Sequence, residues 1–172
     1  GLQVWATAPG HKTFLKEHPP GPSKYIADVG CGYGPIGLTI AKVSPHHQLY
    51  MLDVNNRALV LTEMNKTKNQ IENAEIIESD CLSGVSDQQF DYILTNPPIR
   101  AGKDVVHRIF EEAYGKLKDQ GALYVVIQKK QGMPSAKKKM QECFNHVEVV
   151  NKSKGYYILK SLKGWFQNRI LI

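Results

Sequence analysis

The sequence predicts an α/β fold built on a doubly wound sheet of seven strands, parallel except for an antiparallel last strand. Three observations lead to this prediction. Strand and helix patterns alternate from Tyr25 onward, residues 121–128 form an almost continuous apolar run, and a short glycine-containing link joins the last two strands. A continuous apolar strand is typical of a parallel sheet that is covered on both faces. A link this short permits an antiparallel hairpin but no crossover.

The expected elements follow one another with few interruptions. Predicted strands cover residues 25–29, 48–52, 75–78, 91–95, 121–128, 147–151 and 156–159, and predicted helices cover residues 35–43, 56–70, 104–118 and 135–144. Pro35 suits the first turn of its helix, because an N–H group has no partner there. Lys66 and Lys68 come late in the second helix, where positive charge favours the helix dipole. The third helix places apolar residues at helical spacing.

Length and composition indicate one globular domain. The chain has 172 residues, of which 42% are apolar, and no apolar run approaches the length of a membrane span. We expect a loop-rich N-terminal segment at 1–24, the domain at 25–162 and a C-terminal tail at 163–172. The three cysteines form no C-x-x-C pair, which argues against a disulfide framework and a zinc site. The expected protein is cytoplasmic, binds no metal or membrane, and is a monomer or homodimer.

A glycine-dense turn follows the first strand. Gly30, Gly32 and Gly34 can adopt positive φ and leave amide N–H groups exposed at a helix N-terminus, where a nucleotide-like ligand can lie against the backbone. The spacing Gly32-x-Gly34-x-x-Gly37 also fits the dinucleotide fingerprint. An NAD-binding oxidoreductase is therefore one interpretation, and a tight strand-to-helix turn without a ligand is another.

Two carboxylates near this turn help to distinguish between NAD and S-adenosylmethionine as the cofactor. Asp28 stands two residues before Gly30, where an anion would repel a pyrophosphate but suit the amino group and sulfonium of S-adenosylmethionine. Asp53 ends the second strand and can accept hydrogen bonds from ribose hydroxyls of either cofactor. Its alternative role is to cap the following helix. Together these residues favour S-adenosylmethionine over NAD.

A second motif follows the strand at residues 91–95. Asn96 is followed by Pro97 and Pro98, which cannot donate backbone hydrogen bonds and should keep the segment stiff and extended. The side-chain oxygen of Asn96 and the carbonyl of Pro97 could receive both hydrogens of an exocyclic amino group and hold its nitrogen toward a methyl donor. A simple loop is the alternative.

Asp28-Val-Gly-Cys-Gly-Tyr-Gly together with Thr95-Asn96-Pro97-Pro98 resembles the class I S-adenosylmethionine-dependent methyltransferases. More narrowly, the chain is similar to the methyltransferase small-domain family, and within it to enzymes that modify the N2 amino group of guanine in small-subunit ribosomal RNA. The resemblance runs from about residue 25 to residue 160 and implies a Rossmann-like methyltransferase sheet. Enzymes acting on adenine N6 or on a protein glutamine amide carry similar motifs, so these acceptors remain open.

The resemblance also implies roles for individual residues. Asp53 would bind the ribose, Asp80 would accept the adenine N6 hydrogens, and the N–H group of Cys81 would reach a ring nitrogen. Asn96 would lie beside both cofactor and acceptor, with Pro97 as its catalytic partner. Ser79 and Asp80 could otherwise form only a turn.

Substrate contacts are expected directly after this motif, at Pro98, Ile99, Arg100 and Lys103. Relatives often have an aromatic residue where Ile99 stands, and an aromatic would stack on a flipped base, whereas Ile99 offers an apolar contact. Arg100 and Lys103 are candidates for contacts to a phosphate, or else belong to a solvated loop. The net charge of +6 favours a nucleic-acid partner, here ribosomal RNA, although lysine-rich faces are often only solvated.

Overall fold

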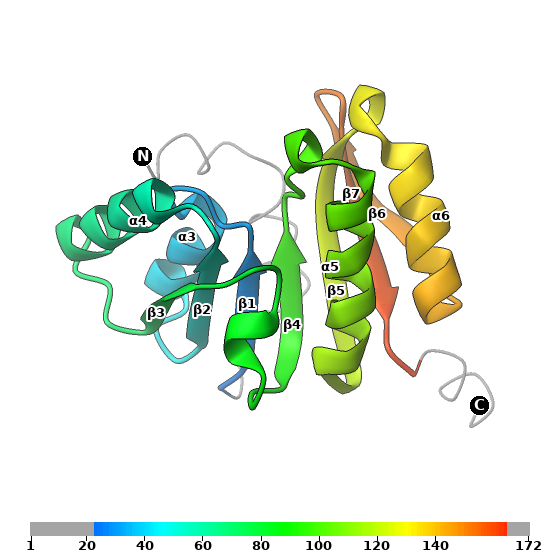
Figure 1. Cartoon of the computed structure of the whole chain (residues 1–172). Helices are drawn as coiled ribbons and strands as arrows, with labels where there is room; N and C mark the ends of the chain where they lie inside the picture. The colour runs from blue at the N-terminus through cyan, green and yellow to red at the C-terminus, as the bar shows by residue number, and fades with distance from the viewer. Residues whose placement is uncertain (1–22, 165–172) are drawn as a thin grey trace.

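The computed structural model describes residues 23–164 and shows one seven-stranded sheet in the order β3-β2-β1-β4-β5-β7-β6 (Figure 1). The strands are β1 (Tyr25–Val29), β2 (Gln48–Asp53), β3 (Ala74–Glu78), β4 (Phe90–Thr95), β5 (Leu117–Gln128), β6 (Glu148–Ser153) and β7 (Tyr156–Leu162). Pairs from β3 across to β5 are parallel, and β7 is antiparallel to both β5 and β6. The predicted sheet is therefore confirmed. Most of the predicted segments 1–24 and 163–172 lie outside the described residues.

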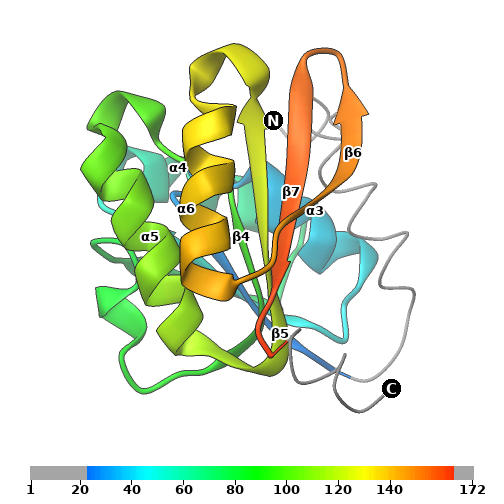
Figure 2. The same ribbon diagram turned by 90° about the vertical axis from the view of Figure 1, so that its right-hand side faces the viewer.

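Helices cover both faces of this sheet. The helices are α3 (Pro35–Val43), α4 (Asn56–Lys68), α5 (Lys103–Lys116) and α6 (Met133–Phe144), and the short 3-10 turns are η1 (Ser83–Val85), η2 (Ile99–Ala101) and η3 (Lys129–Gln131). Figure 2 shows α5 and α6 on one face and α3 on the other. Two apolar clusters correspond to the two faces: one contains the buried residues of α5 and α6, and the other contains those of α3.

Alternation along β5 explains how one strand serves both clusters. Leu123, Val125 and Ile127 pack with α5 and α6, while Tyr124 and Val126 pack with α3. Successive side chains of a strand point to opposite faces, so a strand buried on both sides must be apolar throughout. This confirms the interpretation of residues 121–128 as a strand buried on both faces, which pairs parallel with β4 and antiparallel with β7.

Several predicted boundaries differ from the structure by one to four residues, and two of them have a clear physical cause. The helix expected to reach residue 118 ends at Lys116, because the backbone of Leu117 is extended and already pairs with Phe90 of β4. The link between the last two strands contains two residues, Lys154 and Gly155, rather than four, since the strand pairing continues to Ser153 and Tyr156. Within residues 23–164, no helix combines the length and apolarity that crossing a membrane requires.

Candidate active site

The two sequence motifs meet at the carboxyl edge of the sheet. Strands β1 and β4 are neighbours, with Val29 opposite Thr95, and the Thr95 hydroxyl donates a 2.8 Å hydrogen bond to the Val29 carbonyl. A Cβ placed on Gly30 would lie 3.7 Å from Cδ of Pro98. The chain leaves β1 toward β2 on one side, while β4 lies on the other side, so this is the point where the strand order reverses. Ligands of open α/β sheets bind outside such a point.

Backbone hydrogen bonds fold the glycine turn, residues 30–34, against β2. Gly30, Gly32 and Gly34 have φ of 69°, 59° and 93°, which confirms the predicted positive φ. The N–H groups of Gly30 and Cys31 both donate to the carbonyl of Leu52, at 2.8 and 2.9 Å, and Gly34 donates to Cys31. The expectation that these amides are free for a ligand is therefore wrong, because those of Gly30 and Gly34 already donate to the carbonyls of Leu52 and Cys31.

Gly32 is the open point of the turn. A Cβ at this position would meet no atom within 4 Å, so a ligand can approach the backbone here. Its N–H group donates a 2.9 Å hydrogen bond to Oδ2 of Asp53. The glycine turn thus offers free space above Gly32 and a carboxylate directly beside it.

Asp53 joins the turn to the end of β2. Besides Gly32, it accepts a 2.9 Å hydrogen bond from the N–H group of Asn55 through Oδ1. The residue that caps α4 is Asn55, whose side-chain oxygen accepts from the N–H groups of Arg57 and Ala58. The alternative role of Asp53 as the helix cap is therefore wrong. Each Asp53 oxygen has a further lone pair, so ribose hydroxyls could still donate to it.

Asp28 is buried beneath the turn, with 2% of its surface exposed. Its Oδ2 accepts a 3.0 Å hydrogen bond from the N–H group of Gly37 in the first turn of α3. Burial raises the pKa of this carboxyl to about 7, and the nearby charge of Asp53 adds to the increase. Burial and these two carboxylates also raise the pKa of the Cys31 thiol. A cation bound beside these carboxylates would favour their charged forms and so lower both pKa values again.

Helix α4 supports the glycine turn from above. The Thr62 hydroxyl, fully buried, donates to the carbonyl of Gly32 at 2.7 Å, and Nδ2 of Asn65 donates to the carbonyl of Tyr33 at 2.9 Å. Sequence reasoning did not single out either residue for this role. A hydroxyl among the apolar positions of the helix is the only signal that could have indicated Thr62.

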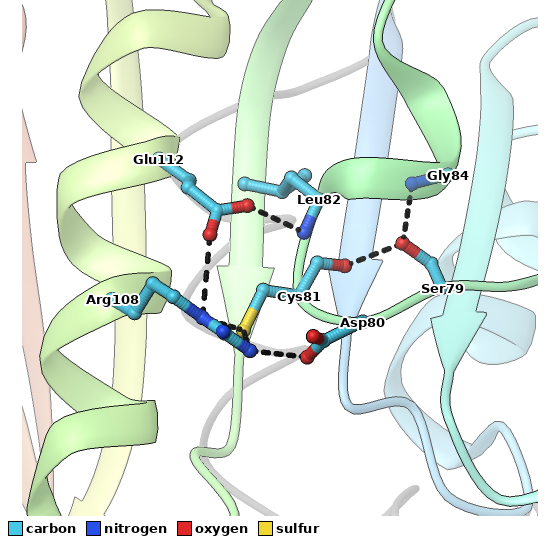
Figure 3. Close-up of polar contacts among 7 residues, drawn as sticks. All are labelled: Ser79, Asp80, Cys81, Leu82, Gly84, Arg108 and Glu112. Carbon is cyan, nitrogen blue, oxygen red and sulfur yellow. Dashed lines mark hydrogen bonds and ion pairs between the residues drawn. The ribbon is translucent and has the colours of Figure 1, made fainter.

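The segment after β3 is organised by hydrogen bonds to its own backbone and to α5 (Figure 3). The Ser79 hydroxyl donates to the carbonyl of Cys81 at 2.7 Å and accepts from the N–H group of Gly84 at 2.9 Å. Cys81 has a φ of 53°, a left-handed conformation that few residues other than glycine adopt. This turn places the side chain of Asp80 on the surface beside α5.

Arg108 and Glu112 of α5 hold this turn in place. The guanidinium of Arg108 forms an ion pair with Asp80 and donates to Sγ of Cys81 at 3.2 and 3.3 Å. Glu112 lies 3.5 Å from Nε of Arg108 and accepts a 3.2 Å hydrogen bond from the N–H group of Leu82 (Figure 3). Neither residue was predicted, because their contacts connect elements that are distant in sequence. In this structure the Asp80 carboxylate is bound by Arg108 of α5, a contact that the sequence did not predict.

The Asn-Pro-Pro segment turns rather than extends. Pro98 has φ −75° and ψ 80°, and the N–H group of Ile99 donates to the carbonyl of Pro97 at 2.9 Å. This is an inverse γ-turn, and η2 follows it directly. The expected stiff, extended continuation is wrong, because Pro98 also tolerates this compact conformation. The Pro97 carbonyl retains a second lone pair, and Asn96 is half-buried beside it.

A cavity of about 170 Å³ opens next to this turn, between the start of α5 and the start of α6. Two of the four predicted substrate residues, Ile99 and Lys103, line it, whereas Pro98 and Arg100 do not. Most of its wall is apolar, and the polar groups include His107 and Ser135, whose Nε2 and Oγ are 3.4 Å apart. Burial lowers the pKa of His107, and Lys103 and Lys139 lower it further. The His107 imidazole therefore faces a largely apolar pocket.

Charge divides the carboxyl edge into two halves. Asp28, Asp53 and Asp80 lie at or just after the ends of β1, β2 and β3, and the cationic residues on the other half, after β4, β5 and β6, are Arg100, Lys103, Lys129, Lys130 and Lys154. The acidic half suits a ligand with positive charge, and the basic half suits a polyanion. Among residues 23–164, no group of three or more His, Cys, Asp or Glu side chains could hold a metal ion.

Comparisons with known proteins agree with this arrangement. The methyltransferase small domain model matches residues 8–160. The chain is 55% identical over 139 residues to the uncharacterized protein YbxB of Bacillus subtilis, covering 80% of this chain and 69% of YbxB. It is 27% identical over 162 residues to the ribosomal RNA large subunit methyltransferase G of Psychromonas ingrahamii, covering 90% of this chain and 42% of that enzyme.

Solved structures show the same fold. The T. thermophilus 16S rRNA N2-guanine methyltransferase RsmC, solved with AdoMet and guanosine, superposes with a TM-score of 0.79 at 20% identity, covering 91% of this chain and 43% of RsmC. A methyltransferase from Pyrococcus furiosus gives a TM-score of 0.75, also at 20% identity, with 88% and 80% covered.

Proposed function

Because this chain belongs to the methyltransferase small domain family, whose methyl donor is S-adenosylmethionine, we propose that it methylates the exocyclic N2 amino group of a guanine in small-subunit ribosomal RNA. The family and cofactor expected from the sequence are thereby confirmed, whereas the acceptor is our proposal. The observation that carries it is the position of Asn96 and Pro97. These two acceptors follow Thr95, which pairs with Val29 just before the glycine turn, and Ile99, whose N–H group donates to the Pro97 carbonyl, lines the cavity.

The acidic half of the edge fits the methyl donor. The open space above Gly32 admits a ligand to the backbone, and Asp53 can accept hydrogen bonds from ribose hydroxyls. Asp80 and the backbone of Cys81 would contact the adenine, with Arg108 fixing the Asp80 carboxylate. Asp28 would stabilise the positive end of the ligand through its field. When bound, S-adenosylmethionine supplies an electrophilic methyl group on a sulfonium.

The residues of this chain align the acceptor. The Asn96 side-chain oxygen and the free lone pair of the Pro97 carbonyl would accept the two hydrogens of the guanine amino group. This contact directs the nitrogen lone pair toward the methyl carbon and stabilises the positive charge that develops on nitrogen. A new N–C bond forms as the S–C bond breaks, S-adenosylhomocysteine leaves, and the extra proton passes from nitrogen to water.

Guanine in RNA is favoured over other amino acceptors by the basic half of the edge and by the cavity. Exposed cations beside the cavity suit a phosphate backbone, and His107 and Ser135 offer hydrogen bonds to a base edge. RsmC, with the same fold, is itself named as an N2-guanine methyltransferase of 16S rRNA. A ribosomal substrate would place the enzyme in the cytoplasm.

The other acceptors have less support. A glutamine amide carries no phosphate and would leave the basic half without a role. Adenine N6 is a similar amino group, so only identification of the methylated nucleoside distinguishes this acceptor from guanine N2. An NAD-binding oxidoreductase is disfavoured by Asp28 near the end of β1, where a carboxylate would repel a pyrophosphate, and by Asn96-Pro97-Pro98, which has no role in binding NAD.

Methyl transfer to defined RNAs tests the proposal. The protein is incubated with labelled S-adenosylmethionine and with 16S transcript, 23S transcript or assembled small subunits, and the RNA is digested to nucleosides. N2-methylguanosine in small-subunit RNA is the expected product. N6-methyladenosine, label only in 23S RNA, or no label in RNA would each contradict it.

The role of Asn96 is tested by Asn96→Ala. We expect kcat to fall about 100-fold or more, while the affinity for S-adenosylhomocysteine stays within about twofold. Asn56→Ala, which removes an exposed asparagine at the start of α4, is the matched control. A collapse of cofactor affinity with preserved turnover per bound cofactor would remove Asn96 from the catalytic role.

A further inference from the structure

Three basic segments from distant parts of the sequence lie together at the carboxyl edge of the sheet. They are η2 with the start of α5, then η3, and finally the turn between β6 and β7, all at the same end of the sheet in both views (Figures 1 and 2). We call their cations the basic rim: Arg100, Lys103, Lys129, Lys130 and Lys154. The rim borders the acceptor half of the site rather than the cofactor half.

Backbone and side-chain hydrogen bonds join two of these segments. The N–H group of Lys129 donates a 3.0 Å hydrogen bond to the carbonyl of Gly155, and Nε2 of Gln128 donates to the hydroxyl of Tyr156 at 2.8 Å. The hairpin turn is therefore held against the end of β5. Gln131 and Gly132, which follow Lys130, already line the cavity. The rim and the cavity are thus parts of one continuous surface.

The lysine in the hairpin turn stands at a position that local preference does not favour. Lys154 and Gly155 have φ of 51° and 80°, so both central residues of the turn are left-handed. Turns of this kind favour asparagine, aspartate or glycine at the first central position. A lysine there costs about 1 kcal/mol relative to glycine. Such a residue, placed against local preference at a loop tip beside a cavity, points to a role in binding.

Rim cations differ in their partners from several other lysines of the domain. Nζ of Lys118 lies 3.5 Å from Asp91, Nζ of Lys139 lies 2.7 Å from Glu111, and Lys163 donates to backbone carbonyls. The side chains of the rim are exposed, and the described part of the chain holds no hydrogen-bond or ion-pair partner for their charged groups. Their charge is therefore available to a phosphate.

We propose that the basic rim binds consecutive phosphates of the RNA strand whose target base enters the cavity, with the β6–β7 turn and η3 contacting the strand on the side away from the cofactor. This inference rests on the proposed function, because it takes the cavity as the acceptor pocket. It extends the phosphate contacts expected at Arg100 and Lys103 to two further segments. Binding here would be independent of base sequence, since phosphate contacts position a nucleic acid without reading it.

The test compares two variants that remove the same charge. Lys130→Gln/Lys154→Gln changes the rim, and Lys66→Gln/Lys68→Gln changes the last turn of α4, which leads into β3, the strand at the far end of the sheet from β6. Binding of a fluorescent single-stranded RNA that contains the methylation target is measured by anisotropy over a range of salt concentrations. Affinity for S-adenosylhomocysteine and the melting temperature serve as checks of folding and of the cofactor site.

We expect the rim variant to bind RNA about tenfold more weakly, and its salt slope to fall by about 0.7 for each phosphate that the variant no longer binds. The control should match the wild type, and cofactor affinity should be unchanged in both. Equal RNA binding by the two variants would refute the proposed role of the basic rim, but it would not contradict the proposed methyl transfer to RNA. If the wild type methylates no RNA at all, the proposed function fails instead.

Discussion

The buried carboxyl of Asp28 should make the stability of this protein depend on pH in an unusual direction. Its pKa in the folded state is about 7, against an ordinary value of 3.8, mainly because of burial. Between these two values the folded state keeps a proton that the unfolded chain has lost. The folded state therefore becomes less stable as the pH rises from 4 to 7, and the effect levels off above pH 7.

The size of the effect follows from the two pKa values. A tenfold change in a protonation equilibrium corresponds to about 1.4 kcal/mol, so the difference between 3.8 and about 7 corresponds to a loss of about 4 kcal/mol. Asp28→Asn removes the ionisation but keeps an oxygen that can accept the hydrogen bond from the N–H group of Gly37. The variant should match the wild type near pH 4 and be more stable by about 4 kcal/mol above pH 7.

Urea unfolding of both proteins at half-unit steps from pH 4 to pH 8 measures this difference, because groups other than Asp28 contribute equally to both and cancel. A difference that stays constant over this range would refute the assignment of the raised pKa to Asp28. The same variant tests the proposed cofactor contact. It should lose more affinity for S-adenosylmethionine than for S-adenosylhomocysteine, since only the former carries the sulfonium charge.

Two further predictions concern the glycine turn. Asp53→Ala removes the acceptor for the N–H groups of Gly32 and Asn55. The variant should bind S-adenosylhomocysteine about tenfold or more weakly in calorimetry, whereas its kcat at saturating cofactor should change much less. Unchanged affinity would remove Asp53 from the site. Gly34→Ala would place a Cβ 2.8 Å from Cδ1 of Leu38 and 2.9 Å from Cγ2 of Thr62, at a φ of 93°. It should lower the free energy of unfolding by about 2 kcal/mol or more, and a thermal melt equal to that of the wild type would contradict the role of this glycine.

Sequence patterns determined most of the fold. The apolar run at residues 121–128 required a strand buried on both faces, and the short link before Tyr156 required an antiparallel hairpin; both requirements are local consequences of side-chain alternation and chain length. The family also followed from local motifs, since the glycine turn and Asn96-Pro97-Pro98 are each contiguous. The C-terminal end of α5 did not follow from the sequence, because the pairing of Leu117 with β4 decides where this helix ends.

The tertiary structure alone decided how the site is held together. Arg108 and Glu112 reach the Ser79–Cys81 turn from α5, and Thr62 supports Gly32 from α4, through contacts between residues about 30 positions apart. Such pairs leave no periodicity in the sequence, so pattern analysis cannot find them. Burial of Asp28, the turn at Pro98 and the gathering of the basic rim depend equally on neighbouring elements. Local chemistry therefore predicted which residues matter, and only packing determined what each of them contacts.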